Sequence, residues 1–207
     1  MVIKKFSILL ISVLSVSILC FQCKEKIRFD CAETIYNFEV GVKEYPGKDT
    51  FHVGDTMWFE IYSPDILKDL ITNNLINYNG VENLGSVIGV QQLDSNNNFI
   101  IKAFNKFSHV LVKGKEVTNN MDPELFREYL FEDKNGYYQF KYAFVAHDTG
   151  IFRISFTNAA NVYRSQDKCS KAAFVINFTQ TDQHYYLFPG FQGNQYNKSG
   201  TYYFKIQ

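Results

Sequence analysis

The sequence predicts an all-β sandwich, and three segments of alternating residues lead to that prediction. Aromatic residues occupy every second position of residues 138–144, so they share one face of a strand. The alternation stops at residues 148–150 and resumes with apolar side chains over 152–156. Residues 57–61 alternate in the same way. Because a strand with one apolar face needs a second layer to cover that face, we expect two packed sheets.

The N-terminal segment has the pattern of a secretory signal. Lys4 and Lys5 precede a charge-free apolar run over residues 6–21, and a polar segment over 24–26 follows. The run is shorter than the roughly 20 apolar residues that span the hydrocarbon core of a membrane. We therefore expect residues 1–22 to be a signal peptide, with a membrane-spanning anchor helix as the alternative.

Cys23 stands where the apolar run meets the polar segment, which is the position of the acylated cysteine in a bacterial lipoprotein. The usual lipobox has Leu or a similar residue three positions earlier and a small residue directly before the cysteine. Cys23 has Cys20 and Gln22 at these positions, and Cys20 has Ser17 and Leu19. We favour Cys23 as the lipidated residue because the charged run begins directly after it. Lipidation of Cys20, or secretion without a lipid, is the alternative.

The leader, the placement of Cys23 and a composition rich in Asn, Lys, Ile, Phe and Tyr together resemble small lipoproteins of Bacteroidota. The resemblance implies a cell-envelope protein that a lipid anchor holds in the outer membrane. Residues 23–30 would form the lipidated tether, and residues 31–207 a single domain. The resemblance leaves open whether the domain occupies the periplasmic or the surface face.

Two cysteines remain in the domain if Cys23 is acylated and Cys20 leaves with the signal peptide. These are Cys31 and Cys169, and we expect them to form a disulfide because exported chains meet an oxidising environment. Each directly precedes a predicted strand, so a bridge requires both strands to begin at the same end of the sandwich. Two free thiols are the alternative.

The strands of the domain follow from alternation and from turn residues. Residues 34–42 predict a first strand with its even positions inward, and a Gly-Asp turn precedes the strand of residues 56–62. Weaker patterns predict four strands in the middle of the chain. A polar stretch that ends at residue 168 follows the two strands of residues 138–144 and 152–156, and two late strands come after it. These six strands are expected over residues 75–78, 86–93, 99–104, 108–112, 172–178 and 199–206.

One or two short helices are expected to cap the sandwich. A Ser-Pro pair predicts the start of a helix over residues 63–70, because proline suits the first helical position. Asp122 as the N-cap, followed by Pro123, predicts a better helix over residues 122–131.

Two turns resemble those of immunoglobulin-like domains. The corner Asp-x-Gly-x-aromatic at residues 148–152 resembles the entry to a late strand of such sandwiches, although Phe152 replaces the usual tyrosine. Val-Gly-Asp-Thr at residues 53–56 resembles the turn between the first two strands of bacterial immunoglobulin-like modules. The resemblance implies an immunoglobulin-like antiparallel β-sandwich.

No residue pattern predicts catalysis, a cofactor or a metal site. His52, His109, His147 and His184 stand singly, without ligand spacing to one another or to a cysteine. The polar loop over residues 94–98 resembles the opening of a calcium loop but lacks its glycine and closing glutamate. We expect a protein that is not an enzyme. An envelope hydrolase is the remaining alternative, because a pair of carboxylates in an all-β fold leaves no sequence signature.

Charge argues against nucleic acid as a partner. Without the two lysines of the leader, nineteen basic residues stand against twenty-one acidic ones, and no basic block is present. Nucleic-acid binding needs a concentrated positive surface. We therefore expect a binding module for a protein or a glycan.

Aromatic residues are the candidate ligand contacts. Trp58 falls on the polar face of its strand, where it is either covered by a loop or available for contact. Tyr185, Tyr186 and Tyr196 belong to an aromatic segment near the C-terminus, and flat rings stack on sugar faces. The alternative is that these rings fill the core. Two or more exposed coplanar rings would favour a glycan.

Overall fold

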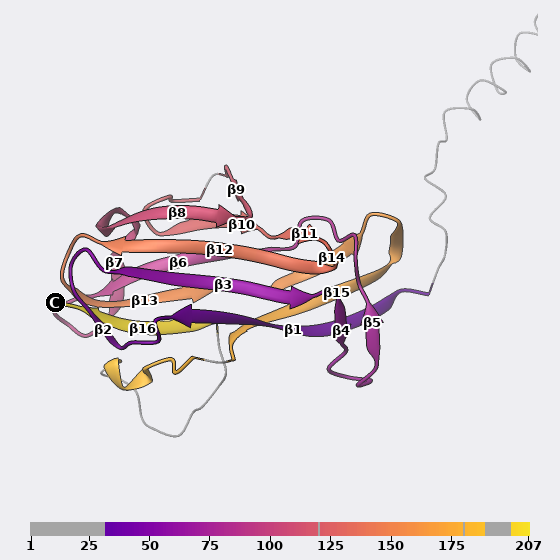
Figure 1. The fold of residues 1–207 in the computed structure, drawn as a ribbon, viewed down its shortest axis with the longest axis horizontal. Coiled ribbons are helices and arrows are strands. Elements are labelled where there is room, and N and C mark those ends of the chain that lie inside the picture. The colour runs from indigo at the N-terminus through magenta and orange to yellow at the C-terminus, as the bar shows by residue number, and fades with distance from the viewer. Residues whose placement is uncertain (1–31, 120, 180, 189–199) are drawn as a thin grey trace, which may run out of the picture. The chain divides into compact units, whose positions relative to one another are not determined.

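The computed structural model describes residues 32–119, 121–179, 181–188 and 200–207. The strands lie in the compact unit Thr34–Gln207. Two seven-stranded sheets pack as a sandwich, and a separate two-stranded hairpin lies beside them (Figure 1). The fold is therefore the all-β sandwich that the alternation predicts.

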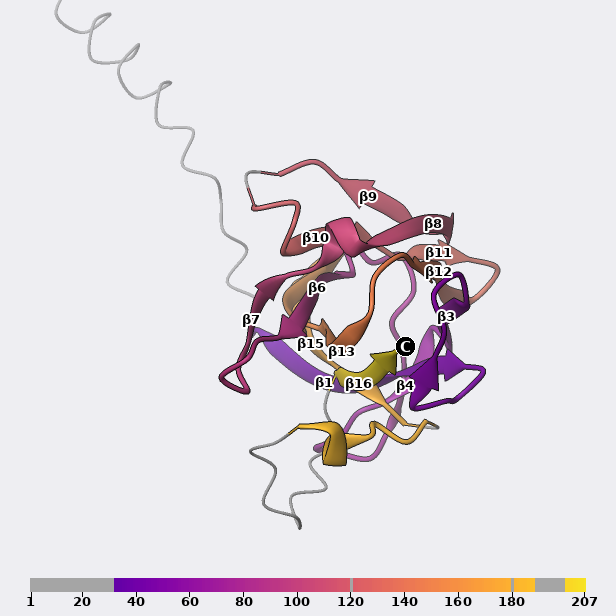
Figure 2. The same cartoon turned by 90° about the vertical axis from the view of Figure 1, so that its left-hand side faces the viewer.

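The first sheet, sheet A, has the strand order β11-β12-β3-β1-β15-β14, and β8 also pairs with β12. Figure 2 shows β1, β3 and β12 side by side as neighbours in this sheet. The strands of sheet A are β1 (Thr34–Tyr45), β3 (Thr56–Pro64), β8 (Phe107–Lys113), β11 (Glu132–Lys134), β12 (Tyr137–Ala146), β14 (Ala159–Arg164) and β15 (Asp167–Phe178).

The second sheet, sheet B, has the order β2-β16-β13-β6-β10-β9, and β7 also pairs with β6. Its strands are β2 (Thr50–Phe51), β6 (Gly85–Leu93), β7 (Phe99–Lys102), β9 (Lys115–Val117), β10 (Phe126–Leu130), β13 (Gly150–Phe156) and β16 (Thr201–Ile206). The hairpin pairs β4 (Ile66–Lys68) with β5 (Leu75–Asn77), and the two short 3₁₀ helices are η1 (Phe104–Lys106) and η2 (Tyr185–Leu187).

The core lies between the inner faces of the two sheets, as the alternation predicts. Strand β12 belongs to sheet A and β13 to sheet B, so the corner at residues 147–149 carries the chain across the sandwich. A side chain in place of Gly150 would collide with the amide of Gln92, so this corner needs glycine. The residues expected in one core are all buried in it: Met57, Phe59, Phe140, Tyr142, Phe152, Ile154, Phe174 and Ile176.

Two strand pairs depart from the antiparallel pattern. Strand β1 runs parallel to β15, with Thr34 opposite Ser170, and β2 runs parallel to β16. The first strand and the late strand therefore begin at the same end of the sandwich. A bridge between Cys31 and Cys169 requires this arrangement, but Cys31 lies outside the described residues and the bridge stays a prediction.

The helix predicted over residues 122–131 is wrong, because strand β10 occupies most of this segment. Asp122 begins only a single turn, in which its carboxylate accepts a hydrogen bond from the Glu124 amide at 3.1 Å. The chain then extends because the Tyr129 ring is buried between the sheets. Its hydroxyl lies 2.7 Å from the Tyr142 hydroxyl of β12. Burial of one side chain thus outweighs the local capping signal.

The helix predicted over residues 63–70 is also wrong. Strand β3 continues through Pro64, and the next residues form the β4–β5 hairpin, with Leu67 opposite Ile76. The prediction also missed β14, which lies in the stretch interpreted as a polar connection. This strand is irregular, with two register shifts against β15, so its sequence lacks a continuous alternation.

Residues 1–22 and the whole predicted tether, residues 23–30, lie outside the described part of the chain, so the signal peptide and the lipid anchor remain predictions. Among the residues that the structure describes, no helix is long and apolar enough to cross a membrane.

Candidate functional site

Four aromatic side chains form the candidate binding surface on the outer side of sheet A. They are Tyr45 at the end of β1, Trp58 and Tyr62 on β3, and Tyr137 at the start of β12, and we call this surface the aromatic face. Strand alternation explains their position. The residues next to them in sequence point into the core, so these four point outward.

The rings of the aromatic face form two pairs with nearly parallel planes. Tyr45 lies opposite Trp58 in the strand register, with ring centroids 6.3 Å apart and planes 11° apart. Tyr62 stacks on Tyr137 at 4.4 Å with planes 16° apart. Tyr62 is 58% exposed, whereas Trp58 is half-buried against its neighbours. Trp58 is therefore neither hidden under a loop nor fully free.

Two lysines lie among these rings. The Lys141 ammonium is 5.4 Å from the Tyr45 centroid, 5.1 Å from the Trp58 centroid and 3.7 Å from a Glu60 carboxylate oxygen. A hydrogen bond with Tyr45, with Glu60 nearby, raises the pKa of Lys141, so this side chain stays charged at neutral pH. The Lys113 ammonium lies 5.8 Å from the Tyr62 centroid. The aromatic face thus combines flat rings with charged hydrogen-bonding groups.

A groove of about 290 Å³ adjoins the aromatic face beside Tyr62. It runs between β1, β3 and the residue that follows β15. Gly41 is needed there, because a Cβ at this position would lie 2.4 Å from the Thr179 hydroxyl. The groove is lined by Gly41, Val42, Lys43, Glu60, Tyr62, Ser63, Pro64 and Thr179.

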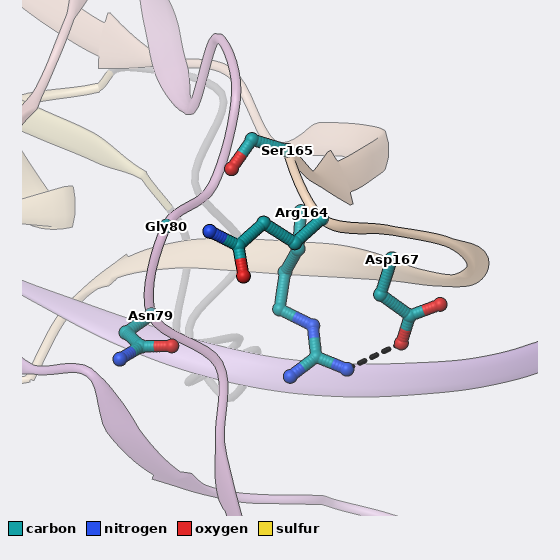
Figure 3. A pocket seen from close by; sticks show the side chains of 6 residues that line it. Asn79, Gly80, Arg164, Ser165 and Asp167 are labelled. Atoms are coloured by element: carbon teal, nitrogen blue, oxygen red, sulfur yellow. Dashed lines mark hydrogen bonds and ion pairs between the residues drawn. The ribbon is translucent and has the colours of Figure 1, made fainter.

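A second pocket, of about 270 Å³, lies where the loop after β5 passes the turn between β14 and β15. Figure 3 shows the Arg164 side chain across this pocket, with its guanidinium paired to Asp167. The Arg164 guanidinium also donates a hydrogen bond to the Asn77 carbonyl at 3.3 Å. The pocket is lined by Asn79, Gly80, Arg164, Ser165, Gln166 and Asp167.

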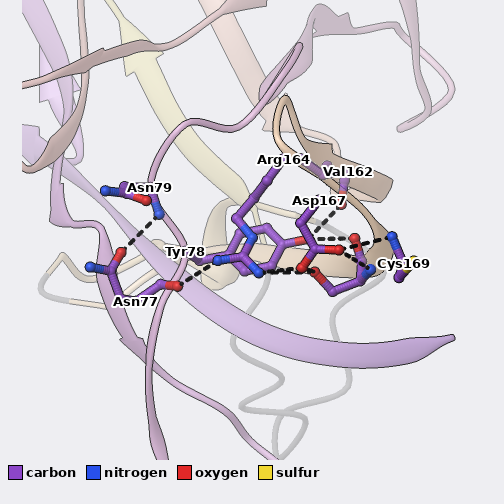
Figure 4. A network of polar contacts seen from close by, with 8 residues as sticks. Asn77, Tyr78, Asn79, Val162, Arg164, Asp167 and Cys169 are labelled. Carbon is purple, nitrogen blue, oxygen red and sulfur yellow. Dashed lines mark hydrogen bonds and ion pairs between the residues drawn. The ribbon is translucent and has the colours of Figure 1, made fainter. Parts of the chain in front are cut away.

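A polar network extends from this pocket into the core, and we call its members Tyr78, Tyr138, Arg164, Asp167 and Ser170 the Arg164 clamp. Figure 4 shows Tyr78, Arg164 and Asp167 of this network. The guanidinium carbon of Arg164 lies 5.2 Å from the centre of the buried Tyr78 ring. The Tyr78 hydroxyl donates to the carbonyl of residue 162 at 2.8 Å. The Tyr138 hydroxyl donates to the Tyr78 carbonyl. The clamp therefore ties the base of the β4–β5 hairpin to sheet A.

The two ionised groups of the clamp, Arg164 and Asp167, form an ion pair. The Asp167 carboxylate accepts hydrogen bonds from the Ser170 hydroxyl at 2.7 Å and from the Cys169 amide at 2.9 Å. These bonds, with the Arg164 guanidinium, lower the pKa of Asp167 to about 2. Burial raises the pKa of Tyr78 to about 12. Both groups therefore keep one protonation state at neutral pH, and the arrangement suits a structural role rather than acid–base catalysis.

The tyrosines predicted near the C-terminus do not join the aromatic face. Tyr185 and Tyr186 lie on η2, which packs against β16 of sheet B, whereas Trp58 lies on sheet A. Tyr185 packs 5.5 Å from Tyr203, centroid to centroid, and the exposed Tyr186 donates a hydrogen bond to Asp49. Tyr196 lies outside the described residues. Of the four predicted contacts, the structure places only Trp58 on the aromatic face.

The remaining candidate groups stay apart. His147 lies 2.6 Å from the Ser108 hydroxyl, whereas the neighbouring Asp148 pairs with Lys106 at 2.6 Å. They therefore do not form an acid–base pair. In the described residues no group of three or more His, Cys, Asp or Glu side chains is placed to hold a metal ion.

The buried carboxyl of Glu44 has no counterpart among the residues that the sequence singled out. Glu44 is 2% exposed, and its position in β1 has the inward phase of that strand. Burial raises the pKa of Glu44 to about 7, although hydrogen bonds from the Tyr202 hydroxyl and the Gly47 amide act in the opposite direction. The outward residues Tyr62, Tyr137 and Lys141 were missed as contacts too. The same strand parity that singled out Trp58 would have found them.

The functional argument rests on this geometry and on the sequence. No protein-family model matches the chain, and the curated proteins contain no match to it.

Proposed function

We propose that the protein is an exported, lipid-anchored protein of the cell envelope that acts as a non-catalytic binding module. The aromatic face is its binding surface. The leader and the placement of Cys23 support export and lipidation. The outer membrane is the proposed site, with either face as the location of the domain, and secretion without a lipid is the alternative.

One observation carries the binding role: Tyr62 and its three partners lie outside a core that buries most of the other rings. Phe59 of β3 and Tyr142 of β12 are fully buried, whereas Tyr62 and Tyr137 lie on the outer side of the same two strands. The core therefore has no need of the outward rings. Aromatic side chains on a surface offer large, rigid contact area at a small entropic cost, and they are frequent in recognition sites.

A glycan is the ligand that the geometry of the aromatic face favours. The two ring pairs are stacked, with planes 11° and 16° apart, and Tyr62 is the exposed ring of the four, so a sugar would pack on the open side of Tyr62. Lys141, Glu60 and Lys113 lie beside the rings, and such groups form hydrogen bonds with sugar hydroxyls. A protein partner is the competing ligand.

Affinity electrophoresis against soluble polysaccharides tests the glycan role. We expect at least one polysaccharide to retard the parent protein, and Tyr62→Ala to lose the retardation. Tyr186→Ala is the matched control, because Tyr186 is 61% exposed and lies on η2, which packs against sheet B. If no polysaccharide retards the parent, or if both variants behave alike, the aromatic face does not bind a glycan.

Mass spectrometry of detergent-extracted protein tests the lipid anchor. We expect an acylated Cys23 at the mature N-terminus, and an unmodified N-terminus at Lys24 would contradict the anchor. Acylation of Cys20 would keep the anchor but lengthen the tether.

The disulfide between Cys31 and Cys169 belongs to the same proposal. The parallel register that puts Thr34 opposite Ser170 supports it, because both cysteines lie within a few residues of this pair in sequence. Peptide mapping without reducing agent should recover the two cysteine peptides linked.

A further inference from the structure

The β4–β5 hairpin exposes a cluster of aliphatic side chains, and we call Ile66, Leu70, Ile71 and Leu75 the apolar tip. Ile71 is 70% exposed and Leu75 72%, while Ile66 and Leu70 are about half exposed. The hairpin lies beside the first half of β1, near the end at which that strand begins (Figure 1).

The register of the hairpin explains why these residues point outward. Leu67 lies opposite Ile76, and this pair packs inward on the core. Residues on either side of the pair therefore face away from the core. They include Ile66, opposite Asn77, and Leu75, opposite Lys68. The tip residues Leu70 and Ile71 extend this apolar surface beyond the last strand pair.

The hairpin exposes one charged side chain to solvent, Lys68, because its two aspartates are buried. The Asp69 carboxylate is buried and accepts hydrogen bonds from the Asn37 amide at 2.8 Å, the Thr72 amide at 2.8 Å and the Thr72 hydroxyl at 2.7 Å. Asp65 is also buried. Within residues 65–77, all of which the structure describes, Lys68 is the only exposed charged side chain.

The hairpin is held firmly at its base. The Arg164 clamp fixes the end of β5 through the Asn77 carbonyl and the Tyr78 ring. On the other side, the Leu70 amide donates to the Asn37 carbonyl at 2.8 Å. The apolar tip therefore lies on a structured hairpin. Exposing its aliphatic side chains to water is unfavourable, and the hydrogen bonds at the base of the hairpin hold them in this exposed position.

We propose that the apolar tip inserts into the interface of the lipid bilayer that holds the acylated N-terminus. This inference rests on the proposed lipid anchor. Asn37, which bonds Leu70, is only three residues from the start of β1 at Thr34, where the tether enters the domain. The segment from Cys23 to Thr34 reaches at most about 40 Å when extended, so it keeps the hairpin near the bilayer.

The chemistry of the tip fits lipid better than the other ligands. Aliphatic side chains bury readily at the boundary of headgroups and acyl chains, and Lys68 reaches phosphates while its methylene stem stays in the apolar layer. The tip has no flat ring on which a sugar could stack. A second lipid-facing contact also strengthens a single acyl anchor and limits rotation of the domain.

Quenching by brominated lipids tests the insertion in the full chain. Ile71→Trp places a reporter on the tip, and Ile100→Trp is the matched control. Ile100 is 65% exposed and lies on β7, which Figure 1 shows near the opposite end of the unit. The parent protein gives the background of Trp58. In vesicles of phosphatidylcholine and phosphatidylglycerol with brominated acyl chains, we expect at least about twofold stronger quenching for Ile71→Trp than for Ile100→Trp.

Equal quenching of the two reporters would overturn the inference, and Leu75→Trp repeats the test if Ile71→Trp fails to fold. A blue-shifted but unquenched Trp at position 71 would also overturn it, because a second copy or another protein would then cover the tip. Mass spectrometry of the same samples keeps the two proposals separate. An acylated protein with equal quenching refutes the tip alone, whereas stronger quenching at position 71 in protein without a lipid refutes only the anchor.

Discussion

The aromatic face and the apolar tip are both exposed surfaces, but they differ in chemistry and in construction. The aromatic face combines Trp58 and Tyr62 with Lys141 and Glu60, so rings alternate with groups that form hydrogen bonds. The apolar tip is aliphatic and carries one exposed cation. We therefore propose a polar ligand for the first surface and a lipid layer for the second.

The supports beneath the two surfaces differ as well. Packed rings of the core, among them Phe59, lie under the aromatic face. The apolar tip depends on the Arg164 clamp, which joins residues far apart in the chain through a buried ring and charged hydrogen bonds. Substitutions that weaken one support should therefore leave the other surface in place.

Loss of the Tyr78 ring should have the largest effect. Tyr78→Ala leaves a cavity and removes the hydrogen bond to the carbonyl of residue 162, so we expect a loss of about 3–5 kcal/mol in the free energy of unfolding. Denaturant titration measures it. Hydrogen exchange should accelerate over residues 66–77 more than over β3. Tyr62→Ala is the control and should change stability by no more than about 0.5 kcal/mol. A loss below about 1 kcal/mol for Tyr78→Ala would show that the clamp does not hold the hairpin.

Titration of Glu44 should affect stability at the end of β1 near the aromatic face. Its folded-state pKa of about 7 exceeds the model-peptide value of 4.5, so the folded protein binds the proton more tightly. Stability should therefore fall as pH rises from about 4.5 to 7, by roughly 3 kcal/mol at most. Thermal unfolding over this range measures the slope. Glu44→Gln should remove most of it, and an unchanged slope in this variant would assign the effect to other groups.

Titration of Asp167 in the Arg164 clamp should change stability in the opposite direction, with stability falling as the pH is lowered. The pKa of Asp167 is lowered from 3.8 to about 2, so its stabilising contribution is complete above 3.8 and is lost as pH falls toward 2. Asp167→Asn should make stability less dependent on pH in this window. Denaturant titrations between pH 2 and 5 compare the variant with the parent, and parallel curves would contradict the role of Asp167.

Substitution of Lys141 should have the smallest effect on the free energy of unfolding. Lys141→Gln removes the ammonium beside Tyr45 and Trp58, and such an exposed cation–π contact is worth about 0.5–1 kcal/mol. Lys43→Gln is the matched control, because Lys43 is exposed and lies on the same outer face of β1 as Tyr45. Equal stability of the two variants would show that the Lys141 ammonium does not stabilise the packing of these rings.

Strand parity was readable from the sequence, and it located the core. The alternation around Phe140, Phe152 and Phe174 predicted their burial, since a strand places successive side chains on opposite faces whatever its neighbours are. Parity also put Trp58 on the outer side. Both helix predictions failed, because the capping signals near Pro64 and Pro123 are local and weak. In the second segment, burial of the Tyr129 ring between the sheets outweighed the capping signal.

By itself, the sequence determined which side chains face inward on each regular strand, because that property has a period of two residues and needs no partner. The tertiary structure alone decided that β1 runs parallel to β15, that Tyr62 meets Tyr137, and that the Arg164 clamp holds the hairpin. These contacts join residues far apart in the chain. Strand register and pairing set them, and both depend on how all the inward faces pack into one core.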